Sequence, residues 1–190
     1  MAASVEILRS CAYRLNAGFT LIELMMTIAI SAILVTVAAP SFQTLILNAR
    51  LSAKKNEFIN ALNLARSTAL SQNSSITVCP LLAASSAACG TSWGAGWIIK
   101  TQPITGAPAL VKAYQSSAKD AVLSAVAFNG TVATSLSFDS RGLSTTQANF
   151  KLCDSRGANF AATMQVLLTG FIQAGPVPGT PIWGGYLSCP

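Results

Sequence analysis

The sequence of 190 residues contains no histidine, and only 9% of its residues are charged. The absence of histidine excludes Ser-His-Asp triads, Cys-His dyads and the commonest ligands of zinc. Glycine loops of the kinds that bind nucleotide phosphates are also absent. The six acidic residues show no arrangement that favours a carboxylate pair for acid–base chemistry. We therefore expect a protein that is not an enzyme and that has no cofactor and no bound metal.

The charge is unbalanced but spread out. Twelve lysine and arginine residues against six acids give a formal net charge of +6, yet the longest basic run is Lys54-Lys55. Scattered bases allow weak attraction to polyanions without indicating a nucleic-acid site, so a plain solvated surface is the simpler interpretation. The apolar fraction of 52% excludes a disordered tail and suits a surface that neighbouring molecules cover.

The cysteine pattern indicates an oxidising compartment. Five cysteines stand at positions 11, 79, 89, 153 and 189. If Cys11 is removed with a leader, an even set of four remains, which suits two disulfides. Buried free thiols are the alternative, and four cysteines permit three pairings.

The longest apolar run extends from Phe19 to Ala39, which is 21 residues. At about 1.5 Å per residue, such a helix reaches about 31 Å, close to the hydrocarbon thickness of a bilayer. Arg9 and Arg14 precede the run, and few bases follow it closely. This asymmetry predicts a cytoplasmic N-terminus and an exported remainder.

Three interpretations of this segment compete: a signal peptide cut after the run, a simple signal anchor, and a leader cut before the run. The small residues at 37–39 resemble a signal-peptide cleavage site, but Pro40 follows them and disfavours cutting there. Glu23 distinguishes a simple signal anchor from a leader cut before the run. A carboxylate inside a membrane helix is costly without a partner, and a simple anchor supplies none. A cut between Gly18 and Phe19 would create a free amine as that partner.

The residues Gly18-Phe19-Thr20-Leu21-Ile22-Glu23-Leu24 resemble the prepilin signature of type IV pilins and type II secretion pseudopilins. The resemblance implies that residues 1–18 are a leader, which a prepilin peptidase removes by cutting after Gly18. It further implies that Phe19 is then N-methylated and that Glu23 guides subunit docking in a filament. Pro40 stands where such proteins commonly place a helix-kinking proline.

After Pro40 the apolar pattern acquires helical spacing, with polar residues between. The apolar positions are Leu51, Phe58, Leu62, Ala65 and Ala69. This pattern predicts that the helix continues to about Ser71 and stops at Gln72-Asn73-Ser74, with a kink or local melting at Pro40.

From Ser75 onward, short β-like runs alternate with turn residues. The candidate strands are Ser75 to Cys79, Trp97 to Lys100, Leu110 to Tyr114, Val122 to Phe128, Ser135 to Phe138, Asn149 to Cys153, Thr163 to Leu168, Phe171 to Ala174 and Ile182 to Cys189. We expect an α+β protein with two small antiparallel sheets packed on the apolar stripe of the helix. By the resemblance this is the type IV pilin-like fold, with a membrane and filament helix at 19–47 and a head at 48–190.

A short motif occurs twice, as Asp139-Ser140-Arg141-Gly142 and as Asp154-Ser155-Arg156-Gly157. Aspartate at the first position and glycine at the last favour two type I turns. The alternative is that Arg141 and Arg156 form a weak contact with a polyanion.

Two tryptophans, Trp93 and Trp97, are interpreted as packing or disulfide-covering residues rather than as a pair that stacks on a ligand.

Later motifs narrow the resemblance to the H-type pseudopilins and FimT- or FimU-like minor pilins. These motifs are Ile76-Thr77-Val78-Cys79, Cys89-Gly90 with Trp93, Gly96-Trp97, and Leu152-Cys153-Asp154 with Arg156-Gly157. The resemblance implies disulfides between Cys79 and Cys89 and between Cys153 and Cys189.

Three functions follow from the resemblance. The first is a minor pilin that initiates or caps a type IV pilus, and the second is a type II secretion pseudopilin. The third is a DNA-binding pilus protein, which some similar proteins achieve with a Gly-Arg-x-Arg motif. The corresponding stretch here is Gly170-Phe171-Ile172-Gln173, which lacks arginine, so DNA is not an expected partner. The expected partners are other minor pilins or pseudopilins, the major pilin and the prepilin peptidase, with the chain crossing the bacterial inner membrane once and its head in the periplasm.

Overall fold

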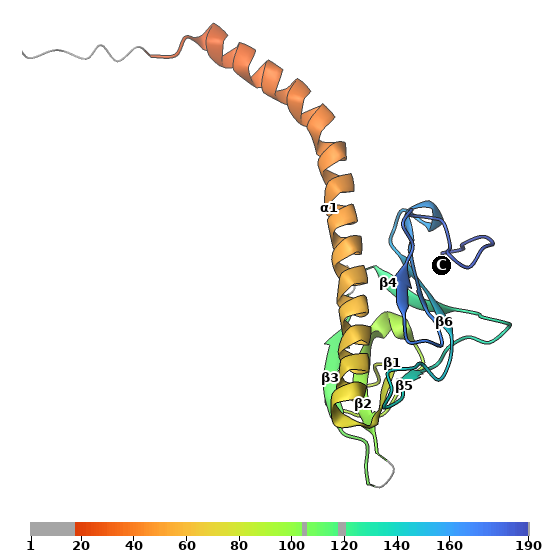
Figure 1. Ribbon diagram of the computed structural model, residues 1–190. Helices are drawn as coiled ribbons and strands as arrows, with labels where there is room; N and C mark the ends of the chain where they lie inside the picture. The colour runs from red at the N-terminus through yellow and green to blue at the C-terminus, as the bar shows by residue number, and fades with distance from the viewer. Residues whose placement is uncertain (1–17, 104–105, 118–120, 190) are drawn as a thin grey trace, which may run out of the picture. The chain divides into compact units, whose positions relative to one another are not determined.

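A computed structural model describes residues 18–103, 106–117 and 121–189, so the predicted leader lies almost wholly outside the described residues. The chain forms one long helix followed by two four-stranded antiparallel sheets (Figure 1). This confirms the predicted α+β fold. The chain divides into two compact units, residues 1–43 and 44–190.

Helix α1 (Leu21–Gln72) has 52 residues and runs unbroken through Pro40, so the local melting considered there does not occur. The helix ends as the sequence predicts. Asn73 adopts a left-handed φ of 48°, and the Ser74 N–H donates to the Ala69 carbonyl at 3.2 Å. This is a Schellman cap, which satisfies one of the carbonyls that the helix end leaves without a partner.

The first sheet has the strand order β3-β2-β1-β5. Its strands are β1 (Ser75–Pro80), β2 (Gly96–Gln102), β3 (Leu110–Gln115) and β5 (Leu136–Phe138). The second sheet has the order β4-β6-β7-β8. Its strands are β4 (Val122–Val126), β6 (Ala148–Cys153), β7 (Ala162–Val166) and β8 (Ile172–Ala174). Two short 3-10 helices, η1 (Trp93–Ala95) and η2 (Ala158–Phe160), precede β2 and β7.

Eight of the nine predicted strands are present, but the prediction of a strand from Ile182 to Cys189 is wrong. Gly184 and Gly185 have φ values of 82° and 83°, which lie far from extended backbone. The apolar residues on either side therefore cannot continue one strand. The segment is nevertheless held in place, because Cys189 is bonded to Cys153 at the end of β6 and the Lys151 ammonium donates to the Ser188 carbonyl.

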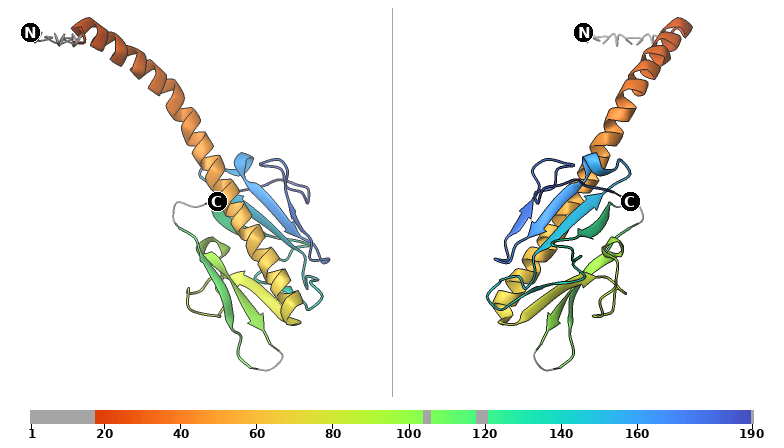
Figure 2. Two further views of the ribbon diagram at one scale, coloured as in Figure 1. Left: turned by 60° about the vertical axis from the view of Figure 1, so that its left-hand side comes forward. Right: turned by 90° about the vertical axis from the view of Figure 1, so that its right-hand side faces the viewer.

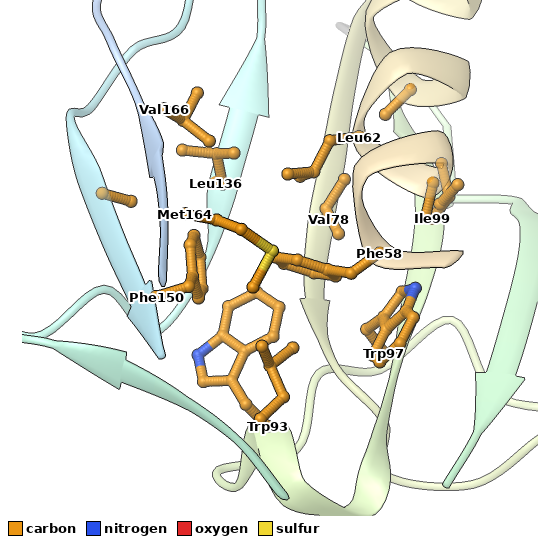
Figure 3. Close-up of a cluster of buried hydrophobic side chains, with 14 of the residues drawn as sticks. Phe58, Leu62, Val78, Trp93, Trp97, Ile99, Leu136, Phe150, Met164 and Val166 are labelled. Carbon is orange, nitrogen blue, oxygen red and sulfur yellow. The ribbon is translucent and has the colours of Figure 1, made fainter. Parts of the chain in front are cut away.

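The apolar stripe of α1 packs against both sheets (Figure 2). Phe58 lies at the centre of this core and is fully buried. Its ring makes edge contacts with Trp97 and Phe150, each at 4.9 Å between centroids, and with Trp93 at 5.9 Å (Figure 3). Since Trp97 belongs to β2 and Phe150 to β6, this ring cluster joins the helix to both sheets. The prediction that the two tryptophans serve packing is confirmed.

Two disulfides lie within the unit that begins at residue 44. Cys79 is bonded to Cys89, with 5.6 Å between their Cα atoms, and closes a loop that begins at the end of β1. Cys153 is bonded to Cys189, with 5.9 Å between their Cα atoms. These are the two pairs that the resemblance implies.

Candidate functional site

The segment around the predicted cleavage position, between Gly18 and Phe19, is exposed. Gly18 lies before the helix with no atom near the position of a Cβ, and Phe19 is 76% exposed. Thr20 precedes the first helical residue, and its hydroxyl accepts a hydrogen bond from the Glu23 N–H at 3.2 Å. Thr20 is therefore the N-cap of α1, and Glu23 lies in the first turn, where the helix dipole favours negative charge.

Sequence reasoning missed the role of Thr20, although the signal was present. A Thr-x-x-Glu pattern before an apolar run is the signature of a capping box. The structure shows half of this box, the bond from the Glu23 N–H to the Thr20 hydroxyl, and places Glu23 in the first helical turn. Within the part of the chain that the structure describes, its carboxylate forms no ion pair.

The first half of α1 presents apolar side chains all round. Its large apolar residues between Leu21 and Leu45 are more than half exposed. By length and composition α1 could cross a membrane. Its hydroxyls also suit such an environment, because Thr27, Ser31 and Thr36 each donate to a carbonyl three or four residues earlier, at 2.7–2.8 Å.

Both Asp-Ser-Arg-Gly motifs form turns, as predicted. The Gly142 N–H donates to the Asp139 carbonyl at 2.9 Å, and the Gly157 N–H donates to the Asp154 carbonyl at 3.2 Å. In each turn the aspartate also accepts from the backbone and the guanidinium of the arginine two residues later. The two motifs therefore form the same structure in two places.

The surroundings of the two arginines differ. The Arg141 side chain is 77% exposed, whereas the Arg156 side chain is only 12% exposed. Arg156 donates to Asp154 Oδ2 at 2.6 Å and to Asn48 Oδ1 on α1 at 2.7 Å, and it lies over the Phe160 ring at 4.4 Å. Arg156 thus attaches its turn to the helix. The proposed polyanion contact remains a prediction, with only Arg141 well exposed to make it.

The pKa values of both turn carboxylates fall below the ordinary 3.8. At Asp139 the strongest influence on the pKa is the hydrogen bond from the Leu143 N–H, to which the Arg141 contacts add. At Asp154 burial acts most strongly and raises the pKa, but the hydrogen bonds and charge of Arg156 outweigh it. Both carboxylates are therefore ionised near neutral pH.

The stretch Gly170 to Gln173 contains the turn between β7 and β8 and the first residues of β8. Phe171 is 57% exposed, so an apolar ring rather than an arginine lies at the surface in this stretch. Across the described residues, no group of three or more cysteine, aspartate or glutamate side chains could hold a metal ion.

Comparison with known proteins agrees with this geometry. A family model described as "Type II transport protein GspH" matches residues 55–170, more than half of the chain. A second, described as "Prokaryotic N-terminal methylation motif", matches residues 13–39. No curated protein matches the chain.

Two crystal structures of the type IV minor pilin FimU from Pseudomonas aeruginosa (strain PAO1) share the fold. The form in space group P21 is 21% identical with a TM-score of 0.52, and the alignment covers 66% of this chain and 88% of that chain. The form in space group P65 is 22% identical with a TM-score of 0.50, and the alignment covers 66% and 93%.

The matched family and the pilin-like fold make this chain a structural subunit rather than an enzyme. Membership of a pilin family implies processing by a prepilin peptidase and assembly with other pilins, and the apolar helix with its methylation motif points to an anchor in the inner membrane. The long helix, the two sheets and the matched motifs together place the chain in the GspH family of type IV pilin-like proteins.

Proposed function

We propose that the chain is a minor pilin that initiates or caps a type IV pilus. The observation that carries the proposal is the exposed apolar half of α1, whose first turn contains the carboxylate of Glu23. Such a helix is stable only in a bilayer or among similar helices, because exposed apolar surface on this scale is strongly unfavourable in water. The helix would leave the membrane by packing among the helices of neighbouring subunits.

In this proposal the peptidase cuts after Gly18, and the new N-terminus at Phe19 is methylated. The helix begins at Leu21, so only Phe19 and Thr20 precede it after the cut. Glu23 would then pair with the amine of a neighbouring Phe19 inside the apolar bundle, where an uncompensated charge is costly. The head would lie in the periplasm, where an oxidising environment keeps both disulfides formed.

A second candidate is a pseudopilin of a type II secretion system. The family model that matches the head carries the description of a type II transport protein, which favours this alternative. The solved structures with the same fold are type IV minor pilins, which favours the first. Both functions use the same helix and the same cleavage.

Deletion of the gene in the source organism distinguishes the two. We expect loss of surface pili, measured by shearing and immunoblotting the filament fraction, with secretion of exoproteins unchanged. Complementation with the wild-type chain should restore piliation, whereas a chain with Glu23→Ala should not. Normal piliation together with lost exoprotein secretion would refute the pilus role and support the secretion role.

A further inference from the structure

A cavity of about 160 Å³ lies between α1 and the loop that follows β8. One face of the helix lines it with Asn48, Leu51, Ser52 and Lys55. Phe160 and Pro176 also line it. Phe160 is the last residue of η2, which lies beside α1 (Figure 2). Since a water molecule in the liquid takes about 30 Å³, the cavity has room for a group of about five non-hydrogen atoms, the size of a phosphate.

The cavity contains a cation that the chain itself does not neutralise. Lys55 is half-buried, and no residue that the structure describes forms an ion pair or hydrogen bond with its side chain. The preceding Lys54 is different, since its ammonium lies 2.8 Å from Glu57 and 4.8 Å from the centre of the Trp97 ring. The Lys55 ammonium is less fully hydrated than that of an exposed lysine, so an external anion beside it would be favourable.

The carboxylates of the described head are already engaged. Glu57, Asp139 and Asp154 are its acidic residues, and they pair with Lys54, Arg141 and Arg156 respectively. A second copy of this head therefore has no spare carboxylate, among the residues described, to place beside Lys55. The anion has to come from a different kind of molecule.

The polar groups around Lys55 are suited to donate. Arg156 donates to Asn48 Oδ1 at 2.7 Å, so the amide nitrogen of Asn48, which lines the cavity, could serve as a donor there. The Ser52 hydroxyl is a further donor. Three donors, one of them charged, match the oxygens of a phosphate, while Leu51 and Phe160 supply apolar walls next to them.

The cavity begins where the predicted membrane and filament helix, residues 19–47, ends. Leu45 and Ile46 are exposed on α1, and Asn48 follows them within one helical turn. Lys55 lies eight residues beyond Leu47, about 12 Å along the helix axis. Helical side chains lean toward the N-terminus, and the polar layer on each side of a bilayer is about 5–7 Å thick. With the predicted helix at 19–47 in a bilayer, a lysine in this position would reach back toward the lipid headgroups.

We propose that the cavity beside Lys55 binds the phosphate of an anionic phospholipid while the chain is anchored in the membrane. Lys55 and Ser52 would contact the phosphate oxygens, and Phe160 and Pro176 would contact the glycerol part. The bound lipid would hold the head next to the membrane before assembly, and it would be released when the helix enters a filament. This inference rests on the proposed membrane anchorage.

The test uses the full chain, purified in a neutral detergent and titrated with phosphatidylglycerol or phosphatidylcholine, with retained lipid measured by native mass spectrometry. The wild-type chain should retain phosphatidylglycerol preferentially. Lys55→Gln should weaken that retention about tenfold, the value of one charged hydrogen bond. Ser52→Phe, which fills the cavity without changing the charge, should weaken it similarly, and Lys100→Gln on β2 is the matched control that should not.

Equal retention by wild type and Lys55→Gln, or equal loss in Lys100→Gln, would overturn the proposal. Free glycerol phosphate should not displace the lipid at equal concentration; complete displacement would mean that the site binds soluble phosphates instead. If Lys55→Gln lowers only the recovery of partner pilins, the anion is an acidic side chain and the lipid proposal fails. Membrane fractionation distinguishes failure of the lipid proposal from failure of the proposed anchorage, because a chain absent from the membrane fraction contradicts the anchorage itself. Unchanged thermal melting of each variant verifies that it folds.

Discussion

Arg66 on α1 donates from Nε to the carbonyl oxygen of Gly142 at 2.9 Å. Its Nη2 also reaches the Thr169 carbonyl at 3.4 Å. One helical side chain thus contacts the turn after β5 and the turn before β8, which belong to different sheets. The turns themselves meet closely, since a Cβ on Gly170 would lie 2.0 Å from the Gly142 oxygen.

Replacing Gly170 by alanine should destabilise the head strongly. Gly170 has a φ of 74°, so alanine is strained there by about 1–2 kcal/mol before the clash with Gly142 is added. The matched control is Gly130→Ala, because Gly130 has a φ of 81° but open space around its Cβ position. Urea unfolding of both variants measures the difference. Equal losses of unfolding free energy would show that the contact between the two turns has no energetic weight.

Glu23→Ala should reduce incorporation of the chain into filaments at least about tenfold, because the neighbouring amine would be left without a partner in an apolar bundle. Glu23→Gln should have a similar effect, since it removes the charge and keeps the size. Thr20→Ser retains the hydroxyl that caps α1 and should assemble normally. Immunoblots of sheared filaments against whole cells give the ratio. Undiminished incorporation of Glu23→Ala would exclude the docking role.

Gly18→Val should leave the leader attached. Gly18 is the exposed residue before the predicted cut, and a branched side chain there should block the peptidase. Intact-mass analysis of the membrane fraction should show the full chain in the variant and a chain beginning at Phe19 in the wild type. A variant chain that also begins at Phe19 would contradict the assignment of the cleavage site.

Removing the disulfide between Cys153 and Cys189 should cost more stability than removing that between Cys79 and Cys89. The two bonds close loops with sequence separations of 36 and 10. Loop-closure entropy then predicts losses of about 4 and about 3 kcal/mol respectively. Paired cysteine-to-serine variants, compared by denaturant unfolding, test the order. A larger loss for the shorter loop would mean that contacts, rather than chain entropy, govern the effect.

The folded head should become less stable in acid because the Asp154 carboxylate is protonated there. Its pKa is lowered in the folded state, so its contribution is complete above the ordinary pKa of 3.8 and is lost as pH falls through the folded value. We expect the melting temperature to decrease below about pH 4, and the decrease to be smaller in Asp154→Asn, which begins from a lower value at neutral pH. Thermal melts between about pH 7 and pH 2 check this. An identical acid dependence in wild type and variant would remove Asp154 from the explanation.

Much of the fold could be predicted because its signals are local. The helix end was readable from Asn73, which tolerates a left-handed φ, and eight strands from short apolar runs between turn residues. The error at 182–189 arose where the composition favours a strand but two consecutive glycines leave the extended region. Local composition indicates strand propensity, but it does not fix the backbone angles of Gly184 and Gly185, which lie far from extended values.

The candidate site was only partly predictable for a related reason. Glu23 and Gly18 belong to a contiguous motif, so their grouping is visible in the sequence. Asn48, Lys55 and Phe160 come together only through tertiary structure, over more than 100 residues of chain. The difference between Arg141 and Arg156 also depends on the fold, because only Arg156 is hydrogen-bonded to a side chain of α1, that of Asn48.

The aromatic cluster around Phe58 gives the chain an internal optical reporter. Two of the chain's three tryptophans, Trp93 and Trp97, are in that cluster. The segment from Met1 to Leu47 contains no tryptophan. Tryptophan emission therefore responds to whether the helix and the two sheets remain closed on one another. The folding of the head can thus be followed in a chain whose apolar segment stays in detergent or lipid throughout.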